Sequence, residues 1–299
     1  MPHLPPIHAL QAFEAVARRR SFALAAMELH LTPSAVSHQI ARLEAQLGVR
    51  LLERSAHGVR LSAAGESYLS RVAGALAAIA SATDDVQHGV SNSLYVHSTP
   101  SLAMLWLMPR LPTFAQAHPE VSLNLSAAHT HSDFALGQAD LDIRYGVPNW
   151  GDLVVEPLFE EPIVPMASPT FIRAHRLKRI EQLLDVPLIQ SNVSVVQWSD
   201  WFAAHSRLRA PQRFALRFDR AQMAMEAAIL GLGVALESAV LAQPHLREGR
   251  LRMVFGLDRC VRVKAHFVVY PARHARRAPV EAFLTWIHRE AARCALAPA

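Results

Sequence analysis

The chain has 299 residues, 51% of them apolar, which is enough sequence for two or more domains with full cores. Its net charge of +5 is mild and fits a polyanionic partner without requiring one. Two widely separated cysteines, Cys260 and Cys294, argue against a disulfide scaffold. There is no basic segment followed by an apolar core at the N-terminus and no apolar run of about eighteen residues, so we expect a cytoplasmic protein without membrane spans.

Helical spacing of apolar residues predicts three helices before residue 48. The first covers about 7–19, and the second begins after Ser21, a good N-cap. The third begins after Thr32, with Pro33 in the first position, where its missing N–H costs nothing. The inward positions of the third helix are Val36, Ile40 and Leu43.

The outer face of the third helix carries small hydroxyls, an imidazole and a guanidinium, namely Ser34, Ser37, His38 and Arg42. Such a helix can enter a DNA major groove and meet base edges and phosphates. The alternative is an ordinary surface hairpin, because short polar residues are common on any solvated helix. The residues that follow favour DNA binding: a strand pair at 49–54 and 59–61 predicts a wing, with Arg54 and Arg60 beside its tip.

A long helix is predicted from Ser62 to about His88. Its apolar positions repeat at spacings of three and four residues, as in a coiled-coil seam: Leu69, Val72, Leu76, Ile79, Thr83 and Val86. The alternative is a single helix lying on a globular core. We favour a dimerisation helix, because a sustained seam between two domains needs a partner to cover it.

From residue 93 the pattern changes to alternating strands and helices, which predicts two small α/β lobes with mostly parallel sheets. The segment 98–101, Ser-Thr-Pro-Ser, precedes a helix predicted over 100–118. Hydroxyls and free N–H groups at a helix start bind carboxylates well, although simple capping would explain one of them. Trp198 and Trp201 are expected in the core rather than against a ligand.

The chain resembles the LysR-type transcriptional regulators over essentially its whole length. The specific motifs are A-F-E-A-V-A-R-x-x-S-F at 12–22, L-T-P-S-A-V-S-H-Q-I-x-R-L-E at 31–44, L-G-V-x-L-L-E-R at 47–54 and L-S-A-A-G at 61–65. Segments at 106–111, 140–146, 198–201 and 218–223 resemble the branch that contains the glycine-cleavage activator, the β-lactamase regulator and the D-serine deaminase activator.

The resemblance implies an N-terminal all-α winged helix-turn-helix at 1–66, a linker and dimerisation helix at 62–89, and a C-terminal effector-binding domain at 90–299. The last is an α/β, two-lobed, periplasmic-binding-protein-like domain. We place lobe I at about 93–162 and 268–299, and lobe II at about 163–267. The resemblance also implies a homotetramer built as a dimer of dimers.

Two sets of site residues follow. The expected DNA contacts are Arg20, Ser21, Thr32, Pro33, Ser34, Ser37, His38, Arg42, Arg54 and Arg60. Pro33 stands where many family members carry a polar residue, so it removes one base contact. The expected effector contacts are Ser98, Thr99, Pro100, Ser101, His129, Tyr145, Ser191, Asn192, Asp219 and Gln222. Asp219 has the alternative role of a helix N-cap.

The sequence contains no G-x-S-x-G, Walker, H-E-x-x-H or helix-opening G-x-G-x-x-G motif, so we expect no enzyme activity and no cofactor. His129 and His131 would share a face of a strand, but two histidines make a weak zinc site, and we expect no metal.

The predicted function is a DNA-binding regulator controlled by a small molecule between the lobes, either a small carboxylate or an amino acid. Its expected partners are double-stranded DNA with a dyad-symmetric operator, the effector, further copies of the chain as homodimer or homotetramer, and RNA polymerase. Two alternatives are a solute-binding receptor, which residues 1–66 oppose, and an α/β enzyme with a regulatory module, which would need a reactive pair in the cleft.

Overall fold

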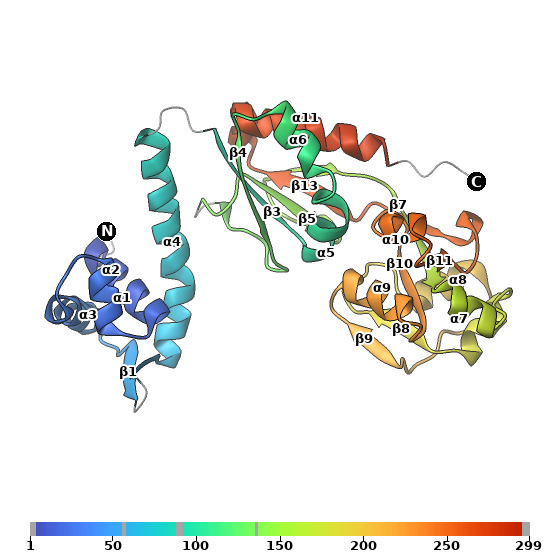
Figure 1. Cartoon of the computed structure of the whole chain (residues 1–299), viewed down its shortest axis with the longest axis horizontal. Helices are drawn as coiled ribbons and strands as arrows, with labels where there is room; N and C mark the ends of the chain where they lie inside the picture. Colours follow the sequence, from blue (N-terminus) through green and yellow to red (C-terminus); the bar gives the residue numbers. More distant parts are fainter. Residues whose placement is uncertain (1–3, 56–57, 88–91, 135–136, 295–299) are drawn as a thin grey trace. The chain divides into compact units, whose positions relative to one another are not determined.

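The computed structural model describes residues 4–55, 58–87, 92–134 and 137–294. The chain divides into an N-terminal unit, Met1–Ser91 with Ala135–Gln138, and a C-terminal unit, Asn92–Phe134 with Ala139–Ala299 (Figure 1). Across the described ranges, every helix is too short or too polar to cross a membrane.

The N-terminal unit packs three helices against each other and continues into a hairpin and a long helix. The elements are α1 (Ile7–Arg19), α2 (Phe22–Glu28), α3 (Pro33–Leu47), β1 (Leu52–Ser55), β2 (Gly58–Leu61) and α4 (Ala63–Gln87). Phe13, Val16 and Leu43 are fully buried in the shared core, and Val36 and Ile40 join them, as the helical spacing predicts.

Side-chain caps set where α2 and α3 begin. Ser21 Oγ accepts a hydrogen bond from the Leu24 N–H at 3.3 Å, and Thr32 Oγ1 accepts one from the Ala35 N–H at 3.2 Å. Such caps satisfy N–H groups that have no partner within the helix. α3 ends at Gly48, whose φ of 69° is the left-handed conformation that glycine adopts most easily. All three boundaries agree with the sequence prediction.

The wing is an antiparallel pair in which Leu52 faces Leu61. Its first strand is shorter than the predicted 49–54 segment, because the preceding residues make other bonds. The Val49 N–H bonds to the Glu44 carbonyl, and the Glu44 carboxylate accepts from the N–H groups of Leu51 and Leu52 at 2.7 and 3.1 Å. Glu44 therefore holds the end of α3 to the start of β1.

The predicted seam on α4 divides into two parts. Leu69 packs on the core of its own unit, and Val72 is buried. Farther along, Ile79 is 49% exposed and Thr83 is also exposed. The side chain of Val86 lies outside the described residues. The exposed part of the seam therefore begins beyond Val72.

The described residues of the C-terminal unit form two sheets. The first has the order β4-β3-β5-β13-β6, and its strands are β3 (Ser93–Ser98), β4 (Ser122–Ala127), β5 (Leu141–Tyr145), β6 (Val154–Pro157) and β13 (His266–Tyr270). The second has the order β11-β7-β10-β8-β9, with β12 also paired to β7. Its strands are β7 (Glu161–Ala167), β8 (Leu188–Ser191), β9 (Leu216–Phe218), β10 (Val234–Ser238), β11 (Arg252–Met253) and β12 (Val261–Val263).

The expectation of mostly parallel sheets is wrong, because both sheets are mixed. β3 runs parallel to β4 and β5, but β13 is antiparallel to β5 and β6. In the second sheet β8 is parallel to β9 and β10, whereas β7 is antiparallel to β10, β11 and β12. The reversed strands β7 and β13 are those that follow the two crossings of the chain between sheets, at 158–160 and 264–265.

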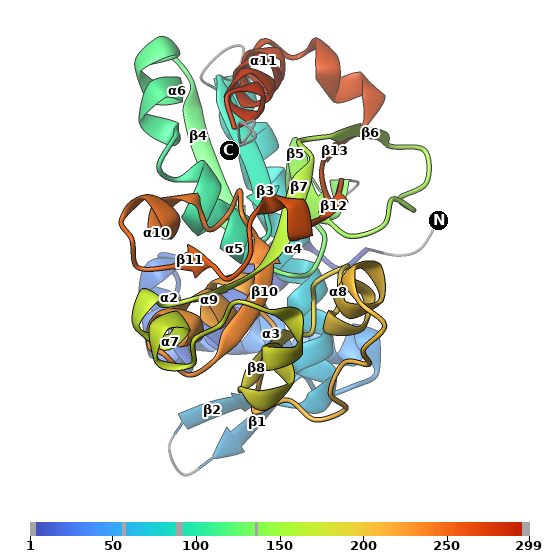
Figure 2. The ribbon, with the colours of Figure 1, turned by 90° about the vertical axis from the view of Figure 1, so that its right-hand side faces the viewer.

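Helices flank both sheets, and Figure 2 shows α7, α8 and α9 around β8 and β10. They are α5 (Pro100–Leu102), α6 (Leu111–Ala117), α7 (Pro169–Ala174), α8 (Trp198–His205), α9 (Ala221–Ile229), α10 (Gln243–Arg247) and α11 (Ala278–Ala292). The remaining described helical turns are η1 (Ala103–Leu107), η3 (Ile180–Asp185), η4 (Leu257–Arg259) and η5 (Ala272–Arg276). The single helix predicted over 100–118 is interrupted between η1 and α6. Pro112 contributes to this break, because it has no N–H to bond to the preceding turn.

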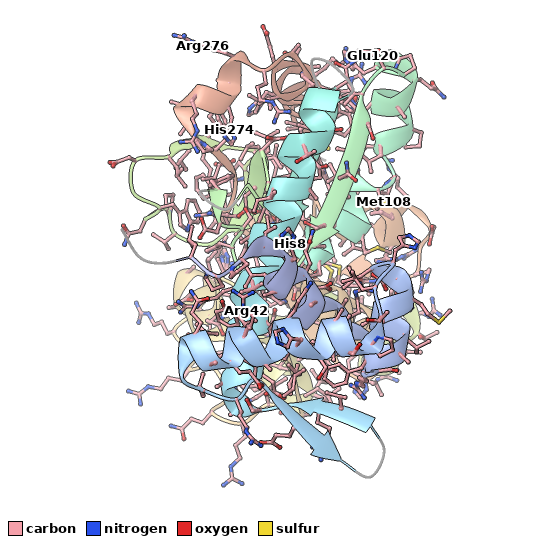
Figure 3. The ribbon with its side chains drawn as sticks, turned by 90° about the vertical axis from the view of Figure 1, so that its left-hand side faces the viewer. His8, Arg42, Met108, Glu120, His274 and Arg276 are labelled. Carbon is pink, nitrogen blue, oxygen red and sulfur yellow. The ribbon has the colours of Figure 1, made fainter. Side chains whose placement is uncertain are left out.

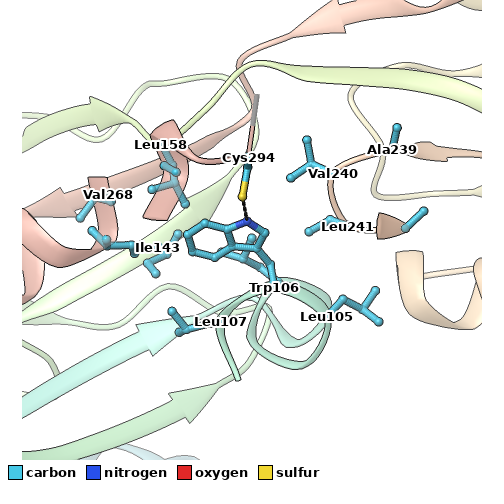
Figure 4. Close-up of a cluster of buried hydrophobic side chains, with 14 of the residues drawn as sticks. Leu105, Trp106, Leu107, Ile143, Leu158, Ala239, Val240, Leu241, Val268 and Cys294 are labelled. Carbon is cyan, nitrogen blue, oxygen red and sulfur yellow. Dashed lines mark hydrogen bonds between the residues drawn. The ribbon is translucent and has the colours of Figure 1, made fainter. Parts of the chain in front are cut away.

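A shared apolar core joins the two sheets. Trp106 is fully buried in it and donates its indole N–H to Cys294 Sγ at 3.1 Å (Figure 4). The same cluster includes Ile143 and Val268 from the first sheet and Val240, which follows β10 of the second sheet. A separate cluster inside the second sheet holds Trp198 and Trp201, which confirms their expected place in the core.

Candidate functional site

The outer face of α3 is fully accessible. Ser34, Ser37, His38 and Arg42 are exposed, and their spacing places them along one side of the helix. Arg42 projects from the middle of α3 (Figure 3). Thr32 and Pro33 are also exposed at the helix start, where Thr32 Oγ1 lies 3.1 Å from Ser34 Oγ. The prediction that these side chains share a solvent face agrees with the structure.

The basic run 18–20 divides between two surroundings. Arg18 and Arg19 are held by carboxylates, since Arg18 bonds to Glu14 and Glu28 and Arg19 bonds to Glu28 at 2.7 Å. The hydrogen bond from Arg18 is the main reason why the pKa of Glu28 falls to about 2, and Arg19 adds to it. Arg20 lies instead on the side of the wing.

Arg20 and Arg60 line one surface hollow together with Leu52, Val59 and Glu66. The Val59 N–H donates to the Arg20 carbonyl at 3.4 Å, which joins the wing to the end of α1. The hydroxyl of Ser21, another expected contact, is used as the cap of α2. The side chain of Arg54 lies outside the described residues.

The C-terminal unit contains a cavity of about 470 Å³ between its two sheets. Six of the expected effector contacts line it: Thr99, Ser101, His129, Tyr145, Ser191 and Asp219. The other four do not. Ser98 is fully buried and donates to the Thr99 carbonyl, while Pro100, Asn192 and Gln222 lie beside lining residues. Asp219 is not the N-cap of α9, because that position belongs to Arg220.

Two hydrogen bonds cross between the sheets at this cavity. The Val195 N–H donates to the Tyr145 hydroxyl at 3.1 Å, and the Gln222 N–H donates to Ser101 Oγ at 3.2 Å. Burial is the largest cause that raises the pKa of Tyr145 to about 12, so its hydroxyl keeps its proton near neutral pH. Both hydroxyls act as acceptors in these two bonds, so each O–H can still donate to a ligand.

Sequence reasoning missed the buried charged residues of the cavity. Glu161 and His266 are 0% and 2% exposed, and Glu161 Oε1 lies 2.8 Å from His266 Nδ1. The ring of His266 also packs against that of Tyr145, with the ring centres 4.7 Å apart. A charged residue at the start of one apolar strand, 161–167, and inside another, 234–238, was the available signal, because lone carboxylates are rarely buried.

Glu237 is the second buried carboxyl that lines the cavity; it is only 4% exposed and lies in β10, the middle strand of its sheet. Burial raises its pKa to about 8, and the charge of Glu161 contributes in the same direction, while the Ser191 hydroxyl opposes them. None of the described residues hydrogen-bonds to Glu237 Oε1 or to Glu161 Oε2.

The described residues contain no group of three or more His, Cys, Asp or Glu that could hold a metal ion. His129 and His131 both line the cavity, but they lie in the loop after β4 and not on a strand. Burial, followed by the charge of Arg144, lowers the pKa of His131. The cavity offers a ligand hydrogen-bonding hydroxyls and ionisable side chains.

Comparisons with known proteins agree with this architecture. Residues 7–66 match the model of the bacterial regulatory helix-turn-helix protein of the lysR family, and residues 87–292 match that of the LysR substrate binding domain. An uncharacterized HTH-type transcriptional regulator of Sinorhizobium fredii, y4mQ, is 40% identical over 95% of each chain. The glycine cleavage system transcriptional activator of Escherichia coli K12 is 34% identical over 97% of this chain and 95% of its own.

Solved structures extend the likeness to three dimensions. The effector domain of AmpR from Pseudomonas aeruginosa superposes with a TM-score of 0.59 at 29% identity, over 67% of this chain and 96% of that one. CbnR, a LysR family regulator, gives 0.69 at 18% identity over 96% and 99% of the chains, which shows the common fold. These relatives are named as regulators and not as enzymes. The chain therefore belongs to the LysR family of DNA-binding transcriptional regulators and carries the family's effector-binding domain.

Proposed function

We propose that the chain binds a dyad-symmetric operator and that a small carboxylate or an amino acid, bound between the two sheets, controls this binding. The observation that carries the proposal is the cavity itself. It is lined by polar groups from both sheets, and hydrogen bonds from Val195 and Gln222 cross beside it. A ligand held by both sheets would favour one arrangement of the sheets over another.

On the DNA side, α3 would enter the major groove with Ser34, Ser37, His38 and Arg42 toward the bases, while Thr32 and Pro33 lie at its leading end. Arg20 and Arg60, with Ser21 and Arg54, would meet the backbone. Base contacts each discriminate by about 1–3 kcal/mol, whereas phosphate contacts add salt-dependent affinity. The exposure of the α3 face supports this assignment of roles.

On the effector side, Thr99 and Ser101 lie at the start of the helical segment of α5 and η1, where hydroxyls and N–H groups suit a carboxylate. Ser98, Pro100, Asn192 and Gln222 would act by shaping this site from behind. One relative is named as the activator of the glycine cleavage system, and this name favours an amino acid.

Assembly and location follow from the same proposal. The open part of the α4 seam, which includes Leu76, Ile79 and Thr83, would pair two copies, and two such dimers would form a homotetramer. The protein would act in the cytoplasm, where its operator lies, and RNA polymerase is the expected further partner. The half-exposed Ile79 supports pairing through α4.

Footprinting on the DNA upstream of the chain's own gene tests the proposal. The wild type should protect two half-sites, and Arg42→Ala should weaken this protection about tenfold or more, the loss expected for one base contact. Arg213→Ala removes an exposed arginine from the other unit and should leave protection unchanged. Light scattering should show the same assembly for all three proteins. Unchanged protection by Arg42→Ala would contradict the assigned role of α3.

A further inference from the structure

The cavity between the sheets has an acidic pair, Glu161 and Glu237, on neighbouring strands. β7 and β10 are antiparallel, with Glu237 opposite Val164, and Glu161 begins β7. Both side chains line the cavity and are at least 96% buried, yet Glu161 Oε2 and Glu237 Oε1 have no hydrogen-bond partner among the described residues. A buried acceptor without a donor is destabilising, so a ligand that supplies donors gains affinity there.

The charges around the cavity favour a cation. The described lining residues include three carboxyl groups, Glu161, Glu237 and Asp219, and neither lysine nor arginine. The histidines His129, His131 and His266 are the remaining ionisable bases, and His266 already faces Glu161. A ligand that carried only negative charge would therefore meet no permanently cationic side chain.

We propose that the effector carries a protonated amine, which binds between the carboxylates of Glu161 and Glu237. An ammonium group has three N–H donors and no acceptor, so it suits carboxylate oxygens that lack a donor. This inference rests on the proposed function, and it selects an amine-bearing effector such as an amino acid over a simple carboxylate. The hydroxyls of Thr99 and Ser101 remain for the rest of the ligand.

Binding of an amine is coupled to a proton. The groups that face Glu237 across the cavity are Glu161 on β7, His266 on β13, Tyr145 on β5, Asp219 before α9, and His129 and His131 after β4. In this setting the empty cavity holds Glu237 mostly protonated at pH 7. The ammonium group requires the carboxylate, so binding releases close to one proton, and affinity rises up to tenfold per pH unit below about pH 8.

The test uses the full chain and a defined set of probes: glycine, the L- and D-amino acids, their N-acetyl forms, and the amines that lack the carboxylate. Thermal shift identifies binders, and calorimetry at pH 7 in buffers of different ionisation enthalpy counts released protons. We expect binding by probes with a free amine, proton release close to one, and no binding by the N-acetyl forms. The proton count needs no variant.

One variant and one control test whether the acidic pair is responsible for amine binding and proton release. Glu237→Gln should lower the affinity at least tenfold and abolish proton release. Glu160→Gln changes the neighbouring, half-exposed glutamate, which lies in the crossing just before β7, and should behave as wild type. Tryptophan fluorescence, which reports on the C-terminal unit, should show a wild-type melting transition for Glu237→Gln near pH 4.5 and so confirm that the variant is folded.

The outcomes separate this inference from the proposed function. If wild type and Glu237→Gln bind N-acetyl amino acids or simple carboxylates equally well, the claim that the effector needs a protonated amine is wrong. The proposal that a ligand controls DNA binding would still stand. Binding of an amine without proton release would also overturn the role of Glu237. If no amine shifts the melting temperature, the inference about the amine fails. The proposed DNA-binding function is tested separately, by operator protection and its loss in Arg42→Ala.

Discussion

The buried carboxyl of Glu237 makes a sharp prediction about stability and pH. In the folded chain its pKa is about 8, compared with an ordinary value of 4.5. Between these two values the folded state holds a proton that the unfolded chain gives up. Folding stability must therefore fall as pH rises from about 4.5 to about 8, and the full destabilisation is present above that range. Glu237→Gln keeps the shape of the neutral acid and removes the titration.

The magnitude follows from the size of the shift. Each pKa unit corresponds to about 1.36 kcal/mol, so the complete effect approaches 5 kcal/mol. Between pH 5 and pH 7 the wild type should lose about 2.5 kcal/mol that the variant does not lose. For a unit of about 200 residues this corresponds to roughly 5–10 °C in melting temperature. The variant should therefore match the wild type near pH 4.5 and exceed it increasingly toward pH 8.

Tryptophan fluorescence measures the relevant transition in the full chain, because all five tryptophans lie in the C-terminal unit. Melting curves of wild type, Glu237→Gln and the exposed control Glu160→Gln should be recorded at pH 5, 6, 7 and 8. A difference between Glu237→Gln and wild type that stays constant over this range would refute the assignment of a neutral Glu237 in the empty cavity.

Three further predictions concern the other elements. Thr32→Ala removes the cap on the Ala35 N–H and should lower the stability of the N-terminal unit by about 0.5–2 kcal/mol in circular-dichroism melts. Thr32→Ser keeps the hydroxyl and should not lower it. Equal losses in both variants would show that this cap does not stabilise α3. Ile79→Glu should dissociate the assembly in light scattering while the exposed control Ser70→Glu does not, and an unchanged mass would exclude this part of the seam. Trp198→Phe leaves a buried carbonyl of β8 without its donor at 2.9 Å and should destabilise the C-terminal unit by about 1–3 kcal/mol in fluorescence melts; a neutral effect would show that the bond is dispensable.

The N-terminal unit was largely predictable because its signals are local. The caps at Ser21 and Thr32, the position of Pro33 and the glycine at 48 each act on residues within a single turn. The same logic failed at β1, where the contact of Glu44 with the following strand is a tertiary effect.

The cavity was predictable only in part. Hydroxyls at strand and helix ends, such as Thr99, Ser101 and Ser191, could be identified from sequence because such positions gather at one edge of an α/β sheet. The pairing of Glu161 with His266 could not, since the two are distant in sequence and meet through the second crossing between the sheets. The position of Glu237 beside β7 likewise depends on the antiparallel register of β7 and β10, which local sequence patterns do not encode.

The most direct test of the account is operator affinity measured by fluorescence anisotropy while an amine probe found by thermal shift is titrated. We expect the wild type to change its affinity for the operator as the probe saturates. Glu237→Gln should bind the operator equally well without the probe but respond only at concentrations at least tenfold higher. Equal responses of both proteins, or no response in the wild type, would contradict the claim that this cavity controls DNA binding.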